Sequence, residues 1–137
     1  MSHPNLELIE HFFAAYTKRD RASLQEVLAE GATWIFPGNH PLSGRHTGAD
    51  AIVAFFDAMG RSMGGAGASV EGLVQGVGAR HVVECQHIRT SRPGGPNLDQ
   101  PLCVLWQFED GKIISGQHLI ADQAQLDAFF NAQPPDA

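Results

Sequence analysis

Between Pro101 and Gln123 the hydrophobic positions alternate with a period of two, which predicts two long strands. The dipeptide Asp110-Gly111 separates them, because a tight hairpin turn needs the positive φ that glycine supplies. One face of the first strand includes Cys103 and Leu105 and is too apolar to be left in water, so we expect a homodimer to cover it. The other face of the first strand consists of four large apolar side chains: Leu102, Val104, Trp106 and Phe108.

The second strand of this hairpin carries polar side chains on a face that is otherwise apolar. Ile114, Gly116, His118 and Ile120 share that face, and Asp122 follows at its end. His118 and Asp122 point the same way, about 13 Å apart by the rise of an extended strand. A glycine between apolar neighbours leaves room for something other than protein. We expect this face to form the wall of a pocket.

Two helices are predicted at the start of the chain. Asn5 caps the first, and Asp20 caps the second, which Gly31 ends. We assign Tyr16, on the first helix, a structural role. The inward face of that helix follows the helical period and consists of Leu6, Ile9, Phe13 and Tyr16.

A short strand over residues 33–36 and a third helix come next. Thr47 and Asp50 have the spacing of a capping box, which places the start of this helix. Gly60 ends it. Its buried stripe consists of Ile52, Phe55, Phe56 and Met59.

The second half of the chain is rich in β-structure. Strands are predicted at residues 68–76 and 80–91, and the direction of His87 stays open because both alternation phases of its strand mix polar and apolar residues. A last helix starts at Asp122. Helices that precede an antiparallel sheet indicate one α+β domain, with an ordered core over about residues 5–131. We expect a highly curved antiparallel sheet, wrapped by the N-terminal helices, around one cone-shaped cavity.

Composition narrows the classes of function. The chain has 137 residues, 43% hydrophobic and 18% charged, as expected for one globular domain with a single core. Its formal net charge of −6 argues against nucleic acid as a partner. No apolar run is long enough to span a bilayer, and the N-terminus lacks the order of a signal peptide, so we expect a cytoplasmic protein. We expect Cys85 and Cys103 to be reduced and buried.

Three segments carry a resemblance to a known family. The run TWIFPGNHPLSGRHTGADAIVAFF, followed by FEDGKI and DQAQLDAFF, resembles the SnoaL-like branch of the nuclear transport factor 2-like superfamily, from Leu6 to Phe130. This superfold hosts isomerases, dehydratases, polyketide cyclases, epoxide hydrolases and ligand-binding modules. In SnoaL-like polyketide cyclases an aspartate that ends the last long strand acts as acid/base, and Asp122 stands at that position. His118 stands where such cyclases often have tryptophan.

The catalytic residues of a ketosteroid isomerase are absent from the matching positions. An alignment without gaps places Phe12 at the catalytic tyrosine, Phe36 at the base and Val104 near the second aspartate. All three are apolar, which excludes that mechanism. The Arg/Asp pair of a limonene epoxide hydrolase is likewise not recognisable on the hairpin.

Each polar candidate has a structural interpretation beside the functional one. Asp122 and Gln125 have capping-box spacing, so Asp122 is either only a cap or both a cap and an acid/base. His118 is either a core histidine bonded to a carbonyl or a proton shuttle in the pocket. His40 and His46 flank a turn at the expected cavity mouth, as surface residues or as contacts to a polar group of the ligand. With His118 they also permit a three-imidazole metal site, although no metal-binding motif supports one.

The sequence therefore predicts a small cofactor-independent enzyme of isomerase, cyclase or dehydratase type. It would act by acid/base chemistry on a hydrophobic small molecule that bears a carbonyl or hydroxyl group. His118 would be the general acid/base and Asp122 would orient or assist it, while Trp34, Phe36 and Trp106 would hold the apolar body. The alternative is a non-catalytic small-molecule binding protein with the same cavity.

Overall fold

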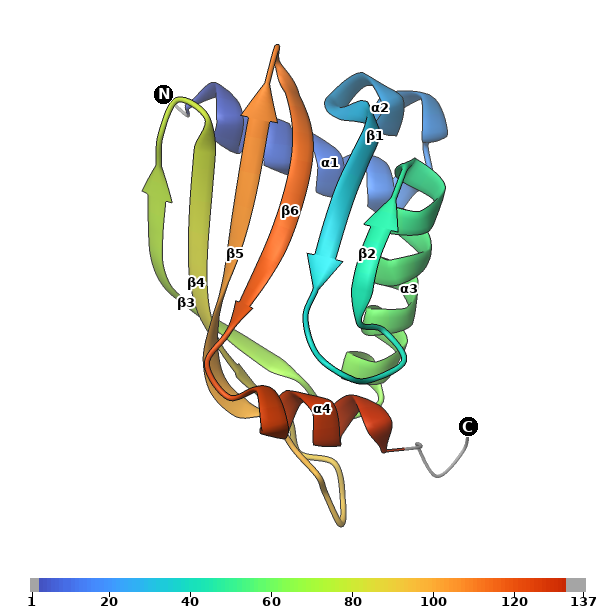
Figure 1. Cartoon of the computed structure of the whole chain (residues 1–137), viewed down its shortest axis with the longest axis vertical. Helices are drawn as coiled ribbons and strands as arrows, with labels where there is room; N and C mark the ends of the chain where they lie inside the picture. Colours follow the sequence, from blue (N-terminus) through green and yellow to red (C-terminus); the bar gives the residue numbers. More distant parts are fainter. Residues whose placement is uncertain (1–2, 133–137) are drawn as a thin grey trace.

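The computed structural model describes residues 3–132, which form four helices and one curved six-stranded sheet (Figure 1). None of the described helices is both long and apolar enough to cross a membrane. The helices are α1 (Pro4–Lys18), α2 (Arg21–Val27), α3 (Ala49–Gly64) and α4 (Gln123–Asn131). The strands are β1 (Leu28–Phe36), β2 (Gly44–Thr47), β3 (Ser69–Val77), β4 (His81–Arg89), β5 (Asp99–Glu109) and β6 (Lys112–Ile120).

The strands lie in the order β2-β1-β6-β5-β4-β3. The predicted α+β class is confirmed, but the sheet is mixed and not wholly antiparallel, because β1 pairs with β6 in parallel. β3 to β6 follow one another as antiparallel neighbours. β1 and β6 are far apart in the sequence, so no hairpin turn forces them to run in opposite directions.

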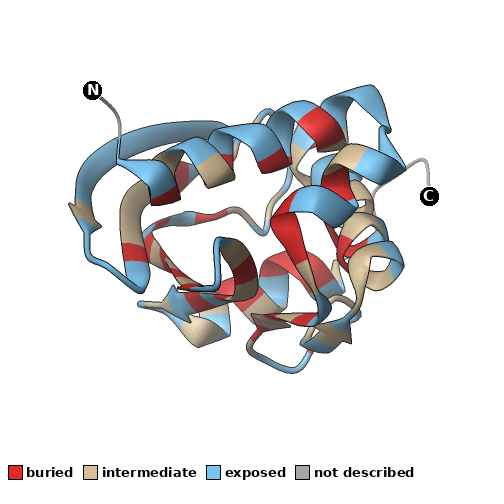
Figure 2. Ribbon diagram, turned by 90° about the horizontal axis from the view of Figure 1, so that it is seen from above, coloured by how far each residue is buried: buried red, intermediate tan, exposed pale blue. Residues whose placement is uncertain are grey.

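The helices enclose the concave side of the sheet. In Figure 1, α1 crosses behind the strands, α3 runs lengthwise beside β2, and α4 lies at the end where β5 and β6 bend. Figure 2 shows that the buried segments of helices and strands face the interior. The core therefore lies between the concave face and the helices, and the large side chains that are least exposed in it include Phe12, Trp34, Phe36, Trp106 and Phe129.

The β5–β6 hairpin forms as predicted. Asp110 and Gly111 take positive φ values of 52° and 73° in its turn. One detail differs: the register shifts after Gln107, so that Ile113 and not Ile114 pairs with Phe108 and is buried. After this β-bulge the regular alternation resumes, and it places Gly116, His118 and Ile120 on the concave face as expected.

α1 packs with a different face from the predicted one. His3 is its N-cap and accepts a hydrogen bond from the backbone N–H of Asn5 at 3.1 Å. The Asn5 side chain is buried instead and donates to two backbone carbonyls in the turn between β3 and β4. Phe12 is consequently buried, whereas Phe13 is 40% exposed. The amide of Asn5 thus helps to set the helix face that points inward.

The predicted end of the second helix is wrong. α2 ends at Val27, and the following residues belong to β1. Leu28 pairs with Ile113 of β6, so tertiary pairing overrides the local stop signal. Gly31, with φ of 75°, lies in the irregular stretch of β1 between its two paired segments.

The predicted capping box of the third helix is not formed. Gly48, with φ of 89°, is the N-cap of α3 and provides no side-chain bond. Asp50 instead forms an ion pair with Arg21 of α2. The helix also continues past Gly60, because an isolated glycine in a helix costs only about 1 kcal/mol.

The expectation of two reduced, buried cysteines is wrong. Cys85 on β4 and Cys103 on β5 are direct partners in the sheet register and form a disulfide. Both are half-buried, on the face of the sheet opposite the buried Leu102 and Val104. Only the pairing register of two strands brings these thiols together, and composition does not reveal it.

Candidate functional site

A cavity of about 330 Å³ lies between the concave face of the sheet, the second half of α3 and α4. That volume equals about eleven water molecules at roughly 30 Å³ each, which is room for a ligand of about a dozen non-hydrogen atoms. None of the described residues that line it is Asp, Glu, Lys or Arg. Its apolar lining includes Phe36, Phe56, Met59, Ile88, Leu98 and Phe130.

His118 is the most deeply buried polar side chain of this lining. The register of β6 places it beside Val104, and its ring centroid lies 4.7 Å from that of Phe36. The residue is 6% exposed, and neither Nδ1 nor Nε2 has a hydrogen-bond partner among the described residues. An unsatisfied buried polar group costs about 1–3 kcal/mol. A ligand with one polar atom next to this ring would remove that cost.

Burial fixes the protonation state of His118. Removal of the imidazolium from water lowers the pKa of His118 from 6.5 to about 4. At neutral pH the ring is therefore uncharged, with an N–H on one nitrogen and a lone pair on the other. Such a ring can donate a hydrogen bond and accept one at the same time. It can also take up a proton at one nitrogen and release one from the other.

Phe36 lines the cavity as predicted, but the two tryptophans do not. Trp34 lies behind the lining, against the backbone of Gly116, where an added Cβ would overlap the indole ring. The glycine thus makes room for a tryptophan and not for a ligand. Trp106 is 1% exposed, and its indole N–H donates to the carboxylate of Glu84 at 2.7 Å. Both tryptophans belong to the core that supports the cavity.

The structure does not bring Asp122 to the cavity beside His118. β6 ends at Ile120, so Asp122 no longer follows the alternation of the strand. It is the exposed N-cap of α4, and its Oδ1 accepts the backbone N–H of Gln125 at 3.0 Å. The Gln125 side chain binds Asp99 and Gln100 instead of returning to the cap. The capping interpretation of Asp122 accounts for its contacts.

His40 and His46 also lie outside the cavity lining. The Nε2–H of His40 donates to the carbonyl of Pro37 at 3.1 Å, and Nδ1 accepts the N–H of Leu42 at 3.2 Å. Burial lowers the pKa of His40, so the ring is neutral, and its two hydrogen bonds stabilise the loop between β1 and β2. His46 lies 3.0 Å from the carbonyl of Leu42 through Nε2. Within residues 3–132 no three His, Cys, Asp or Glu side chains gather as a metal site.

Two polar residues of the lining were missed from the sequence. Tyr16, expected to be structural, contributes to the cavity wall, and its hydroxyl donates to Asp57 at 2.7 Å. Burial and the hydrogen bond to this carboxylate raise the pKa of Tyr16. The pKa of Asp57 is lowered by the hydrogen bond from Tyr16 and, to a smaller extent, by the one from Arg19. Gln86 of β4 also lines the cavity. It lies two residues before Ile88, on the same face of the strand, so alternation predicts its position if the face of β4 that points inward is known.

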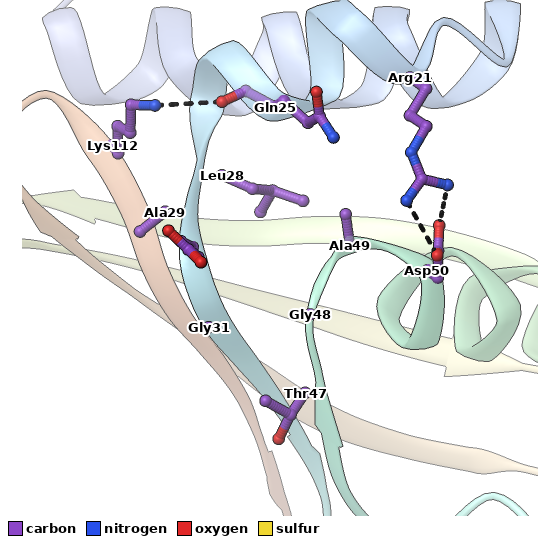
Figure 3. Close-up of a pocket in the computed structure, with 11 residues that line it drawn as sticks. Arg21, Gln25, Leu28, Ala29, Gly31, Thr47, Gly48, Ala49, Asp50 and Lys112 are labelled. Atoms are coloured by element: carbon purple, nitrogen blue, oxygen red, sulfur yellow. Dashed lines mark hydrogen bonds and ion pairs between the residues drawn. The ribbon is translucent and has the colours of Figure 1, made fainter.

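A second hollow, of about 590 Å³, lies between α2, β1 and the start of α3 (Figure 3). Most of its charged groups already have partners inside the protein, and the remaining one, Glu30, is exposed. Arg21 forms two hydrogen bonds with Asp50, and the ammonium of Lys112 donates to the carbonyl of Gln25 at 3.1 Å. This hollow therefore lacks the unpaired buried group that distinguishes the His118 cavity.

Comparison with known proteins places the chain among relatives of similar length. It is 28% identical over 127 residues to an uncharacterized protein of Mycobacterium tuberculosis, covering 92% of this chain and 95% of that one. Bal32a, from a soil-derived mobile gene cassette, has 29% identity and a TM-score of 0.73 over 93% of this chain and 96% of its own. A Xanthomonas campestris protein of unknown function with a cystatin-like fold has 25% identity and a TM-score of 0.71, over 93% and 98%.

The model of one domain family matches most of the chain. It describes a SnoaL-like domain and matches residues 9–116, which contain α3, β5 and most of β6 with Gly116. The solved structures with a similar fold include others described as NTF2-like. The chain therefore belongs to the SnoaL-like domain family.

Proposed function

We propose that this protein binds a hydrophobic small molecule with a carbonyl or hydroxyl group in the His118 cavity, and that it moves a proton on that molecule without a cofactor. The observation that carries the proposal is the imidazole of His118, which is buried in an apolar wall with both nitrogens free of protein partners. Buried polar groups in proteins are nearly always hydrogen-bonded. A polar atom of a ligand is the partner that this ring lacks.

Proton transfer at a single neutral imidazole is chemically complete. The unprotonated nitrogen of His118 takes a proton from a carbon next to the ligand carbonyl, and an imidazolium and an enolate form. Return of a proton to another carbon or to the oxygen restores the neutral ring and leaves an isomer of the ligand. An isomerase of the acid/base type needs this sequence of steps. A cyclase shares the first step, after which the enolate carbon attacks a second carbonyl of the ligand and the imidazolium returns its proton to the oxygen of that carbonyl. An apolar wall favours both reactions by limiting the access of water to the enolate.

A non-catalytic binding protein is the second candidate. The pKa of His118 near 4 makes the ring a weak base, and Asp122 lies outside the cavity lining. A binding protein needs only the shape of the cavity and one hydrogen bond. The two candidates therefore share the ligand class and differ in whether His118 abstracts a proton.

Binding and proton abstraction can be measured with one probe, the bicyclic ketone 2-tetralone. Titration calorimetry is expected to show that the ketone binds and that His118→Phe weakens binding by about tenfold, the effect of one lost hydrogen bond. His46→Phe, the same substitution outside the lining, is the control and leaves binding unchanged. Failure of the ketone to bind the wild-type protein, or equal binding to His118→Phe, contradicts the proposal.

Nuclear magnetic resonance in D₂O then separates the enzyme from the binding protein. The wild-type protein should exchange the hydrogens next to the ketone carbonyl for deuterium faster than buffer does, and His118→Phe should return the rate to that of buffer. Exchange should persist after exhaustive chelation. Binding that depends on His118 without accelerated exchange would identify the non-catalytic binding protein.

A further inference from the structure

We infer that the ligand is an uncharged molecule with polar groups at both ends of an apolar body, and that Gln86 binds the group farthest from His118. This inference rests on the proposed function, because it concerns the same cavity. It names a specificity-determining residue and a narrower ligand class.

The sheet register places Gln86 and His118 on the same concave face but well apart. Gln86 of β4 pairs with Leu102 of β5, which in turn pairs with Ile120 of β6, two residues beyond His118. With strands about 4.8 Å apart and a rise of about 3.4 Å per residue, the two Cα atoms are about 12 Å apart. Leu102 lines the cavity between them. Both side chains reach from the concave face into the cavity, so the gap between their polar atoms is shorter than the distance between the Cα atoms. A ligand with two fused rings and a polar group at each end suits this gap.

The amide of Gln86 is free to bind a ligand. None of the hydrogen bonds of the described residues involves its side chain, although the residue is half-buried. Its partner on β3 is Gly72, where an added Cβ would meet nothing within 4 Å, so the space beside the amide is open. Glu84, the preceding inward residue of β4, differs, because its carboxylate accepts hydrogen bonds from Trp106 and Gln75.

The cavity offers no counter-charge to an ionised ligand. None of the described lining residues carries a formal charge at neutral pH, since His118 is uncharged there and Gln86 is an amide. Transfer of a carboxylate or ammonium from water into such a site without a partner is strongly unfavourable. A neutral imidazole and a neutral amide each donate and accept hydrogen bonds, which suits hydroxyl and carbonyl groups.

Three naphthalene probes test this inference by fluorescence titration: 2-naphthol, naphthalene-2,6-diol and 6-hydroxy-2-naphthoate. The wild-type protein should bind the diol about fivefold to tenfold more tightly than 2-naphthol, the gain from one added hydrogen bond. It should bind the naphthoate at least about tenfold more weakly than the diol. In Gln86→Leu the diol should lose its advantage while the affinity for 2-naphthol is retained.

Two further variants keep the result interpretable. Gln86→Met tests the loss of the amide with another apolar side chain, in case Gln86→Leu does not fold. Gln107→Leu, on the opposite face of the sheet, is the matched control and should leave the diol preference intact. If neither naphthol binds the wild-type protein, the proposed function itself is overturned. If both bind through His118 and neither Gln86 variant removes the diol preference, or if the naphthoate binds as well as the diol, only this inference is overturned.

Discussion

The indole ring of Trp34 occupies the space that a side chain at Gly116 would need. The two residues are partners in the parallel pairing of β1 and β6, and an added Cβ at Gly116 would overlap the ring carbons of Trp34. The ring is held from its other sides by Phe56 and Trp106, each with its centroid 4.9 Å away. The same indole ring contacts His118, with the two ring centroids 5.6 Å apart.

Gly116→Ala should therefore destabilise the protein by about 1–3 kcal/mol, the usual cost of overpacking a core. The ring of Trp34 is 2% exposed and packs against Phe56 and Trp106, so it cannot move away from the new methyl group without displacing them. Chemical denaturation measures the loss. Gly72→Ala is the control, because its new methyl group meets open space, and it should change the free energy of unfolding by less than about 1 kcal/mol. Wild-type stability in Gly116→Ala would mean that the ring does not lie on this glycine.

The hairpin and the inward position of His118 were predictable because both depend on local signals. The period of two specifies which side chains of a strand share a face, and Asp110-Gly111 specifies the turn. Contacts between distant strands have no such signal. Alternation does not reveal whether the space beside Gly116 is empty or filled by Trp34.

The same limit explains the other differences between prediction and structure. Cys85 and Cys103 meet only because β4 and β5 pair in one particular register. Alternation along the last strand predicts that Asp122 shares a face with His118, but the strand ends at Ile120 and helix geometry takes over. Gln86 lines the cavity, but both faces of β4 mix polar and apolar residues, so the sequence does not indicate which face of this strand points inward.

Asp122→Asn tests whether the cap of α4 has a second role. Asparagine keeps an oxygen that accepts the N–H of Gln125, so stability should stay within about 1 kcal/mol of wild type. Ligand affinity and proton exchange should also be unchanged, because Asp122 lies outside the cavity lining. Asp122→Ala removes the cap and should cost about 1 kcal/mol in denaturant unfolding. A fall in exchange rate at unchanged stability in Asp122→Asn would show that this carboxylate acts in the reaction.

We propose a homodimer that covers the convex face of the sheet. Leu73, Val74 and Leu119 are 51%, 62% and 45% exposed, and Leu119 pairs in the register with Cys103 of the predicted contact face. Light scattering at micromolar concentration should give a mass near twice 14.8 kDa. Leu119→Glu should shift the mass to the monomer, whereas Val77→Glu, on the concave side of β3, should not. A wild-type mass of 14.8 kDa would contradict the dimer.

The burial of His118 should make stability depend on pH between the pKa of the folded state, about 4, and the ordinary value of 6.5. In that window the unfolded chain binds a proton that the folded protein does not bind, so the free energy of unfolding falls as the pH is lowered. From pH 7 to pH 5 the expected loss from this one group is about 2 kcal/mol.

His118→Phe isolates this contribution from the other titrating groups. Burial also lowers the pKa of His40, and hydrogen bonds lower the pKa values of Asp57 and Asp127. These groups therefore also reduce the free energy of unfolding as the pH falls. They are present in both proteins and cancel in the difference. Denaturant unfolding at pH 7 and pH 5 should therefore show a smaller loss in His118→Phe by about 2 kcal/mol. An equal loss in the two proteins would mean that His118 is charged or solvated in the folded state, and the ring would then not be the unpaired buried group on which the proposed function depends.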